Sequence, residues 1–303
     1  MIRWERLQEE APWCRRDSMG EVVHDGKMWI FGGYTPTRIN DVWSSADGIK
    51  WELVTPQAPW GGRNLPCALA HKGRMWIMGG FAPKDETTNR FPAYNDVWSS
   101  ENGADWTLVT QAPWSTRGAA GALVFDNKMW VMGGFDGRDF GHSDEVWSSE
   151  NGADWQLVCR APWGPRAMHA CLVYSKWMWV LGGGVYDDRH PFNTIADYGD
   201  VWRSADGVNW EEVTPAAGWA ARRFHCAAVF ADGGYHKMWV LGGYHQGNRN
   251  DVWSSRDGRT WTEEETAWPV RHEPGCLVFG ERLWIIGGFG DTLYNDVWAG
   301  SGI

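Results

Sequence analysis

Runs of about five mostly apolar residues alternate with short polar turns along the whole chain. In each unit of this pattern, a first run such as Gly121–Phe125 leads through a tight turn such as residues 25–27 to a second run such as residues 28–31. A third run such as residues 41–45 and a fourth such as residues 51–55 follow after another turn. Asp-Gly turns between β-rich runs are typical of hairpins. The pattern therefore predicts four short antiparallel strands per unit and an all-β protein.

The four-strand unit occurs six times. A glycine pair follows the second apolar run of every unit, and 24 of the 25 tryptophans fall into four registers of six. The glycine pairs are Gly32-Gly33, Gly79-Gly80, Gly133-Gly134, Gly182-Gly183, Gly242-Gly243 and Gly287-Gly288. Six copies of a four-stranded unit predict a six-bladed β-propeller, one domain over residues 1–303. We expect the tryptophans to pack between blades.

The two ends of the chain are out of phase with the unit. Residues 296–298 form a third strand followed by a turn-like tail, whereas residues 2–7 have the pattern of a fourth strand. We therefore expect the N-terminal strand to complete the last blade and close the ring, which leaves no open seam.

These features resemble the kelch-repeat propellers, of the kind found in the central domain of galactose oxidase. The glycine pair after an apolar strand, the tryptophan several residues after the third strand and the repeat of about 50 residues carry the resemblance over essentially the whole chain. Tryptophan replaces the tyrosine that often precedes the glycines in that family. The resemblance implies that the face around the central channel binds ligands or partners, and stand-alone six-bladed members include a sialic-acid anomer epimerase.

Strand alternation puts the blade-joining loops and the loops between second and third strands on that same face. A Trp-x-x-Arg motif begins every blade, and an arginine present in all six is expected to tie loops together rather than to react. These arginines are Arg16, Arg63, Arg117, Arg166, Arg222 and Arg271.

Positions that differ between blades are better guides to function. After the motif arginine come Asp17, Asn64, Gly118, Ala167, Arg223 and His272, and after the glycine pair come Tyr34, Phe81, Phe135, Gly184, Tyr244 and Phe289. We predict an aromatic ring around the channel mouth with a gap at Gly184, and polar groups that orient a ligand. The predicted ligand-binding residues are Tyr34, Asn64, Phe81, Phe135, Arg223, Tyr244, His272 and Phe289.

Charge is distributed unevenly. The chain has a net charge of −10, but the loops of the mouth face include Arg38, Arg90, Arg138, Arg189 and Arg249 and sum to a positive charge. This favours a small anionic ligand. The negative net charge of the whole chain predicts no binding to nucleic acid or to a membrane surface. The start of the chain has no apolar signal region, so we expect a cytoplasmic monomer, unless a leader has been removed.

Histidine and cysteine offer few signs of a cofactor. His142, His169, His190, His225, His245 and His272 map to the mouth face, but His169 and His225 share one repeat position, which favours a structural role. None of the six cysteines forms a CxxC pair, and we expect Cys67, Cys171, Cys226 and Cys276 to be buried thiols. We therefore predict no metal and no cofactor.

Two classes of function remain open. One is a small-molecule site at the channel mouth, with isomerase- or lyase-type chemistry for which Asp17, His272, Glu273, Tyr34 and Tyr244 are the acid–base candidates. The alternative is a protein-interaction platform that binds a peptide or partner protein on the same loops. The sequence does not decide whether the protein is an enzyme.

Overall fold

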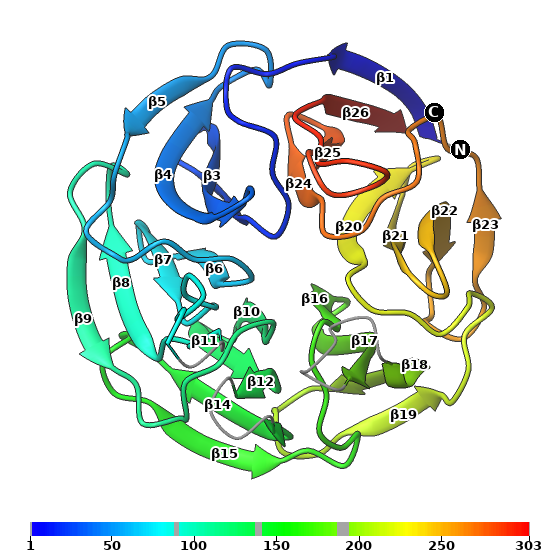
Figure 1. The fold of residues 1–303 in the computed structure, drawn as a ribbon. Helices are drawn as coiled ribbons and strands as arrows, with labels where there is room; N and C mark the ends of the chain where they lie inside the picture. The colour runs from blue at the N-terminus through cyan, green and yellow to red at the C-terminus, as the bar shows by residue number, and fades with distance from the viewer. Residues whose placement is uncertain (1, 88–90, 137–140, 187–193, 303) are drawn as a thin grey trace.

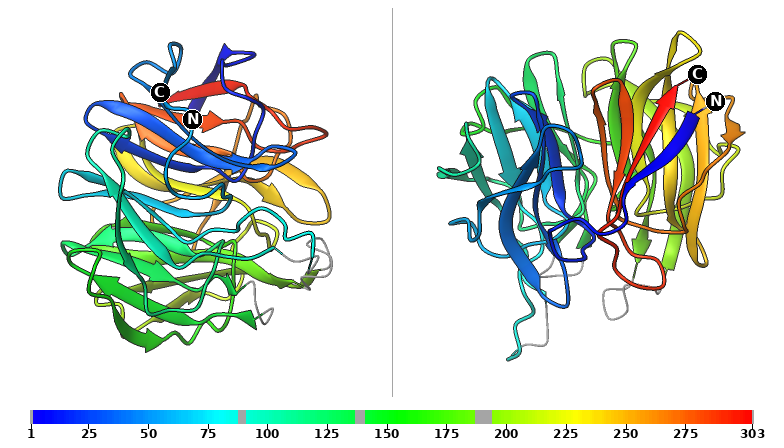
Figure 2. Two further views of the ribbon diagram at one scale, coloured as in Figure 1. Left: turned by 60° about the vertical axis from the view of Figure 1, so that its left-hand side comes forward. Right: turned by 90° about the horizontal axis from the view of Figure 1, so that it is seen from above.

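The computed structural model describes residues 2–87, 91–136, 141–186 and 194–302. Six four-stranded antiparallel sheets stand around a central axis as the blades of a propeller (Figure 1). Viewed from the side, the strands run roughly between two faces formed by loops (Figure 2). The prediction of an all-β, six-bladed propeller is confirmed. The described part of the chain contains no helix long and apolar enough to span a membrane.

In blades one to five the first strand in sequence lies nearest the axis, and in the sixth blade, which has the N-terminal strand at its outer edge, residues 275–279 take this place. Blades one to three are β2 (Gly20–His24), β3 (Lys27–Tyr34), β4 (Arg38–Ser45), β5 (Glu52–Thr55); β6 (Cys67–His71), β7 (Arg74–Met78), β8 (Asp96–Ser100), β9 (Thr107–Gln111); and β10 (Gly121–Phe125), β11 (Lys128–Met132), β14 (Glu145–Ser149), β15 (Gln156–Arg160). A separate two-stranded sheet, β12 (Phe135–Asp136) with β13 (Gly141–His142), extends blade three.

The other three blades repeat this arrangement. They are β16 (Ala170–Tyr174), β17 (Trp177–Tyr186), β18 (Thr194–Ser204), β19 (Glu211–Thr214); β20 (Cys226–Asp232), β21 (Tyr235–Tyr244), β22 (Asn248–Ser255), β23 (Thr262–Glu264); and β24 (Gly275–Phe279), β25 (Arg282–Ile286), β26 (Val297–Gly302), β1 (Ile2–Gln8).

The N-terminal strand closes the ring as predicted. β1 pairs antiparallel with β26, so that the sixth sheet has the order β1-β26-β25-β24 and both termini lie in one blade (Figure 1). The pairing runs from Gln8 opposite Val297 to Ile2 opposite Gly302, with an irregularity between Arg6 and Gln8. The residues after Trp298, predicted to be a turn-like tail, are therefore strand, because β1 supplies partners for their backbone groups.

The glycine pair does not always end the second strand. In blades one, four and five the strand continues past it, with a register irregularity such as that between Phe31 and Gly33. Gly32 and Gly33 have φ values of 56° and 106°, which glycine adopts without steric cost. The pair therefore acts as a bulge where a third strand remains in reach.

The tryptophans pack within and between blades, as expected. In every blade the indole of the Trp-x-x-Arg motif meets, edge to face, the indole of a tryptophan in or directly before the fourth strand, as between Trp60 and Trp106 at 5.7 Å. The hydrophobic cores lie between neighbouring blades, so that Trp29 and Phe31 of blade one pack with Met75 and Ile77 of blade two. Trp4 of β1 completes the sixth pair, which ties the closing strand to the core.

The motif arginines are structural, as expected, although their anchors were only partly foreseen. Arg63 is completely buried, donates to the carbonyl oxygen of Gly79 at 2.8 Å and makes a two-pronged ion pair with Asp96 of the third strand. The other blades repeat the contact, with Glu145 as the acid in blade three. Because both charges are buried together, removing either would leave the other without a counter-ion.

A closed circle of backbone hydrogen bonds surrounds the channel. The residue two places after each motif arginine has positive φ, and its N–H donates to the carbonyl oxygen of the equivalent residue in the preceding blade. The circle consists of Ser18, Leu65, Ala119, Met168, Phe224 and Glu273, and the bond from Ser18 to Glu273 at 3.1 Å completes it. The six bonds fix the spacing of the blades at the channel mouth.

Candidate functional site

The residues predicted to surround the mouth do come together there. In all six blades the residue after the motif arginine forms an antiparallel backbone bridge with the residue after the glycine pair. The pairs are Asp17 with Tyr34, Asn64 with Phe81, Gly118 with Phe135, Ala167 with Gly184, Arg223 with Tyr244, and His272 with Phe289. All eight predicted ligand-binding residues therefore lie at one end of the channel.

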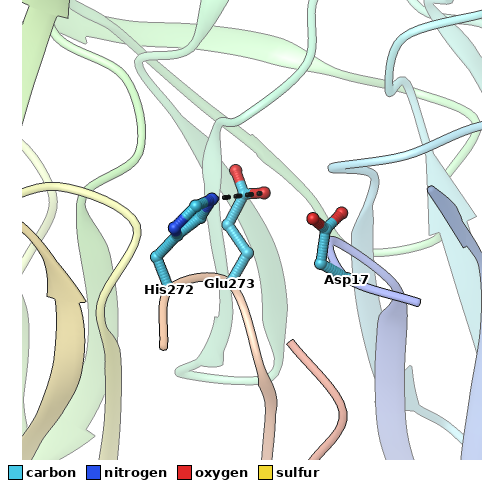
Figure 3. Close-up of side chains that lie close together, drawn as sticks. All are labelled: Asp17, His272 and Glu273. Atoms are coloured by element: carbon cyan, nitrogen blue, oxygen red, sulfur yellow. Dashed lines mark ion pairs between the residues drawn. The ribbon is translucent and has the colours of Figure 1, made fainter. Parts of the chain in front are cut away.

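Four side chains from blades one and six form a polar cluster at this end. The Ser18 hydroxyl lies 2.7 Å from Oδ1 of Asp17 and 2.5 Å from Oε2 of Glu273. Nε2 of His272 lies 3.9 Å from the same Glu273 oxygen. Figure 3 shows Glu273 between the imidazole of His272 and the carboxyl of Asp17. The circle of backbone bonds brings these residues together, although 255 positions separate Ser18 from Glu273 in the chain.

The cluster must contain a protonated carboxyl. Two hydrogen bonds link Asp17, Ser18 and Glu273, but a serine hydroxyl has one hydrogen to donate. The second hydrogen therefore belongs to a carboxylic acid. Burial raises the pKa of Asp17 from 3.8 to about 7 and the pKa of Glu273 well above its usual range. Glu273, whose ionisation the Asp17 charge also disfavours, is thus assigned as the acid that donates to Ser18, which in turn donates to Asp17.

Asn248 of β22 sets the tautomer of His272. The side-chain amide of Asn248 donates through Nδ2 to the carbonyl oxygen of Gly290, so its Oδ1 faces Nδ1 of His272 at 2.6 Å. Because an amide oxygen only accepts, Nδ1 carries the hydrogen and the lone pair of the neutral ring is on Nε2. Burial and the charge of Arg223 lower the pKa of His272 to about 4, so the ring is neutral at pH 7.

Arg38, at the start of β4, places a positive charge beside the acids. Its Nε donates to Oδ1 of Asn64 at 2.6 Å, which in the described chain is the one hydrogen bond of its side chain. The guanidinium stands over the rings of Phe91 at 4.2 Å and Tyr34 at 5.7 Å. Its charge favours the ionised forms of Asp17 and Glu273. The arrangement leaves the fork of Arg38 suited to a carboxylate ligand.

Arg223 has a different environment from the one expected of a mouth residue. Its side chain is completely buried, its NH1 donates to Asp197 of β18 at 2.5 Å, and it stands over the ring of Tyr244 at 5.1 Å. His245 lies 3.5 Å from the other oxygen of Asp197. Arg223 therefore acts on the site through its charge in this structure, and its direct contact with a ligand stays a prediction.

The aromatic residues form a packed wall on the opposite side of the mouth. Phe81 and Phe135 are buried and lie 5.9 Å apart, and Phe135 also contacts Tyr186 at 4.8 Å. A Cβ at Gly184 would lie 2.5 Å from the carbonyl oxygen of Ala196 in β18, so the paired strand occupies the space on that side of the residue. The gap in the aromatic ring stays a prediction. The loop arginines Arg90, Arg138 and Arg189 lie outside the described residues.

Among the described residues, no group that could hold a metal ion contains more than one histidine of the mouth face. The rings of His169 and His225 are buried against Trp163 and Trp219, and burial lowers the pKa of each to about 3. His142 packs on Phe135 instead. His190 lies outside the described residues.

One group of side chains could hold a metal ion. Candidate ligand atoms of Asp17, His272 and Glu273 lie within 4.8 Å of one another. However, the charge of Arg38 acts on Asp17 and Glu273, the charge of Arg223 acts on His272 and Glu273, and Ser18 already joins the two carboxyls. Two neighbouring guanidinium charges disfavour a divalent cation, so the donor set suits proton exchange better.

Beneath the mouth the channel opens into a cavity of about 230 Å³. Its wall includes Ser18 and Glu273 of the cluster and, deeper, Glu21 of β2. Burial raises the pKa of Glu21 to about 8. Sequence reasoning missed Ser18, Glu21 and Asn248. Comparing the six repeats two and five residues after the motif arginine would have found Ser18 and Glu21. Most of the residues at these two positions in the other blades are small or apolar.

Comparison with known proteins supports the fold and goes no further. No family model matches the chain, and no curated protein matches it. Among solved structures that are similar, the structure of YjhT superposes with a TM-score of 0.76 at 16% sequence identity, over 96% of this chain and 96% of that one. At this identity the likeness shows a shared six-bladed propeller fold, and the resemblance to kelch repeats stays a prediction.

Proposed function

We propose that the protein binds a small carboxylate-bearing molecule at the channel mouth and moves a proton within it, as an isomerase or lyase does. The observation that carries the proposal is the pair of short contacts from the Ser18 hydroxyl to Asp17 and to Glu273, which we interpret as one ionised and one protonated carboxyl side by side. A pair of acids in opposite protonation states supplies both a general base and a general acid at neutral pH.

After each turnover, the hydrogen-bonded residues Asp17, Ser18 and Glu273 can return to their original protonation states. The Asp17 carboxylate takes a proton from the ligand, and the Glu273 acid gives its proton to another atom of the ligand or to a leaving group. Asp17 is then protonated and Glu273 ionised. Ser18 then passes its hydrogen to Glu273 and receives the hydrogen of Asp17. After one turnover Asp17 is again ionised and Glu273 is again protonated. The contacts of 2.7 and 2.5 Å on either side of the hydroxyl support this exchange.

Arg38 is the proposed anchor of the ligand's carboxylate. It is partly exposed, lies against the aromatic rings of Tyr34 and Phe91, and is oriented by Asn64. Its interaction with Asp17 and Glu273 places a bound carboxylate close to the acids. His272, neutral and with its lone pair on Nε2, is a hydrogen-bond acceptor for a ligand hydroxyl.

Solvent deuterium exchange tests this function. The wild-type protein is incubated in D₂O with a panel of 2-oxo acids and 2- and 3-hydroxy acids, and loss of C–H signals is followed by proton NMR. We expect Asp17→Asn and Glu273→Gln to slow exchange by at least about 100-fold, and Arg38→Met to raise the concentration needed for half-maximal rate. Glu212→Gln, on the exposed surface of β19, is the control. Exchange that survives both acid substitutions would refute the proposed roles.

A peptide-binding platform is the second candidate, and one observation favours it. Phe91, Ile195 and Val270 project from mouth-side segments with exposures of 43%, 68% and 37%. Apolar side chains at the rim of a groove are typical of partner contacts. A phage-displayed peptide library would distinguish the two functions. The platform predicts enriched peptides whose binding is lost in Phe91→Ser with Val270→Ser and kept in Asp17→Asn.

We also assign the six units to the kelch-repeat type, in a cytoplasmic monomer. The glycine pairs with positive φ and the tryptophan packing repeated in every blade support the repeat type. Sedimentation equilibrium tests the oligomeric state, and a second species at micromolar concentration would contradict it.

A further inference from the structure

The cavity beneath the mouth is continuous with the proposed site but differs from it in charge. Ser18 and Glu273 belong to both, whereas Arg38 stands at the mouth and is not part of the cavity wall. Among the described residues, the charged side chains of the wall are Glu21 and Glu273, and the wall includes no lysine or arginine. A ligand that enters from the mouth therefore passes from a positive group to a wall whose ionisable carboxyls, among the described residues, are those of Glu21 and Glu273.

Glu21 is an exception among the residues at its position in the repeat. The other five blades have alanine or cysteine there, namely Ala68, Ala122, Cys171, Ala227 and Cys276. Those small side chains line the cavity and leave room in it, while Glu21 alone brings a carboxyl. The N–H of Cys276 donates to Oε1 of Glu21 at 3.2 Å, which holds the carboxyl in place across the junction of blades six and one.

In the part of the chain that the structure describes, the wall has no lysine or arginine to neutralise Glu21. His169 and His225, which also line the cavity, are neutral at pH 7 because burial lowers the pKa of both rings. Cys226 donates its thiol hydrogen to the carbonyl oxygen of Pro274 at 3.0 Å and so offers no charge. Glu21 is partly buried, and a carboxyl in such a place without a counter-ion favours its protonated form until a cation takes the place of the proton. The cavity is thus built to accept a cationic group.

We propose that the channel cavity binds an ammonium group with Glu21 as its counter-ion, and that the ligand is a zwitterion with its carboxylate on Arg38 and its amine in the channel. The carboxylate half of this assignment rests on the proposed function. The ligand class that fits is an ω-amino acid, in which an apolar chain separates the two charges.

The chain length of the ligand follows from the fold. Asp17 and Glu21 are four residues apart on one segment, which spans at most about 14 Å. The charge of Arg38 acts on Asp17, and the segment is not fully extended because Ser18 has a φ of 54°, so the two charges of the ligand lie closer together than that. We expect a separation of roughly 5 to 9 Å, which corresponds to chains of about four to seven carbons.

Calorimetric titration with a homologous series tests the proposal. The probes are 4-aminobutanoate, 5-aminopentanoate, 6-aminohexanoate and 8-aminooctanoate, each compared with the equal-length alkanoate and ω-hydroxy acid. We expect an intermediate ω-amino acid to bind at least tenfold more tightly than its two neutral-ended analogues. Binding at pH 7 also releases a proton, seen as a difference in heat between two buffers of unlike ionisation enthalpy.

Glu21→Gln separates the two halves of the site. The amide oxygen still accepts from the N–H of Cys276, so the fold is preserved while the charge is lost. The tenfold preference for the amine should vanish in Glu21→Gln, with alkanoate binding unchanged, and should persist in the surface control Glu212→Gln. Equal affinity for amino and hydroxy acids, an unaffected Glu21→Gln, or no binding of any probe would overturn the proposal. Amine binding that depends on Glu21 but not on Arg38 would instead refute the proposed anion site and leave the cavity assignment standing.

Discussion

Replacing Glu21 with glutamine should stabilise the protein above neutral pH. The pKa of this carboxyl is raised from 4.5 to about 8 by burial, so the folded state keeps a proton that the unfolded state releases between those values. Stability therefore falls as the pH rises through that window, and glutamine, neutral in both states, removes the fall. At about 1.36 kcal/mol per pKa unit, the loss approaches 5 kcal/mol above pH 8, as an upper bound. We expect Glu21→Gln to recover about 2–4 kcal/mol at pH 8.5, because water in the channel solvates part of the charge.

Urea unfolding followed by tryptophan fluorescence measures this effect. Wild type, Glu21→Gln and the exposed control Glu212→Gln are compared at half-unit steps from pH 5 to pH 9. The difference between Glu21→Gln and wild type should be smallest at pH 5 and grow steadily to a plateau above pH 8. The control should follow wild type throughout. A difference that does not change with pH, or a Glu21→Gln variant that is less stable at pH 8.5, would refute the idea that this carboxyl is buried without a counter-ion.

Three further predictions concern the scaffold. Deletion of residues 2–8 should expose β26, lower the melting temperature and cause aggregation; an unchanged melting temperature would contradict ring closure by β1. Gly103→Ala should cost at least about 3 kcal/mol and Gly73→Ala about 1 kcal/mol, since both have positive φ but only at Gly103 would a Cβ meet a neighbouring indole, at 2.3 Å; equal melting temperatures would exclude that clash. The buried, neutral His169 and His225 make stability fall as pH drops from 6.5 toward 3, because the unfolded chain binds the extra protons, so replacing both with glutamine should flatten urea midpoints below pH 6.

The fold could be predicted because its determinants are local and repeated. Each glycine pair and each tryptophan register marks the same place in a blade. One copy that departs from the pattern therefore does not change the prediction made from the other five. The local sequence does not determine how strands far apart in the chain pair with one another. The continuation of β3 past Gly33 and the pairing of Gly302 with Ile2 depend on whether a partner strand lies in reach. Those two features were the ones that the pattern misjudged.

Only some residues of the candidate site could be predicted from the sequence, for a related reason. Comparing the blades at the position after the motif arginine found Asp17 and His272, because a polar residue among dissimilar ones stands out. Ser18 gains its role from an acid 255 positions away, and Asn248 from a ring on the next blade. No local pattern encodes such contacts. The closure of the ring, which brings blade one beside blade six, creates them.

The circle of six backbone hydrogen bonds also shapes the electrostatics of the mouth. In a helix the peptide dipoles align along one axis and add up to a partial charge at each end. In this circle each N–H points to the carbonyl of the preceding blade, so the dipoles run head to tail around the channel and their vector sum cancels. The circle itself therefore contributes no net dipole in the plane of the mouth. The potential that a ligand meets is set by the six side chains of the circle and their neighbours, which can change in sign or polarity without disturbing the bonds that hold the blades together.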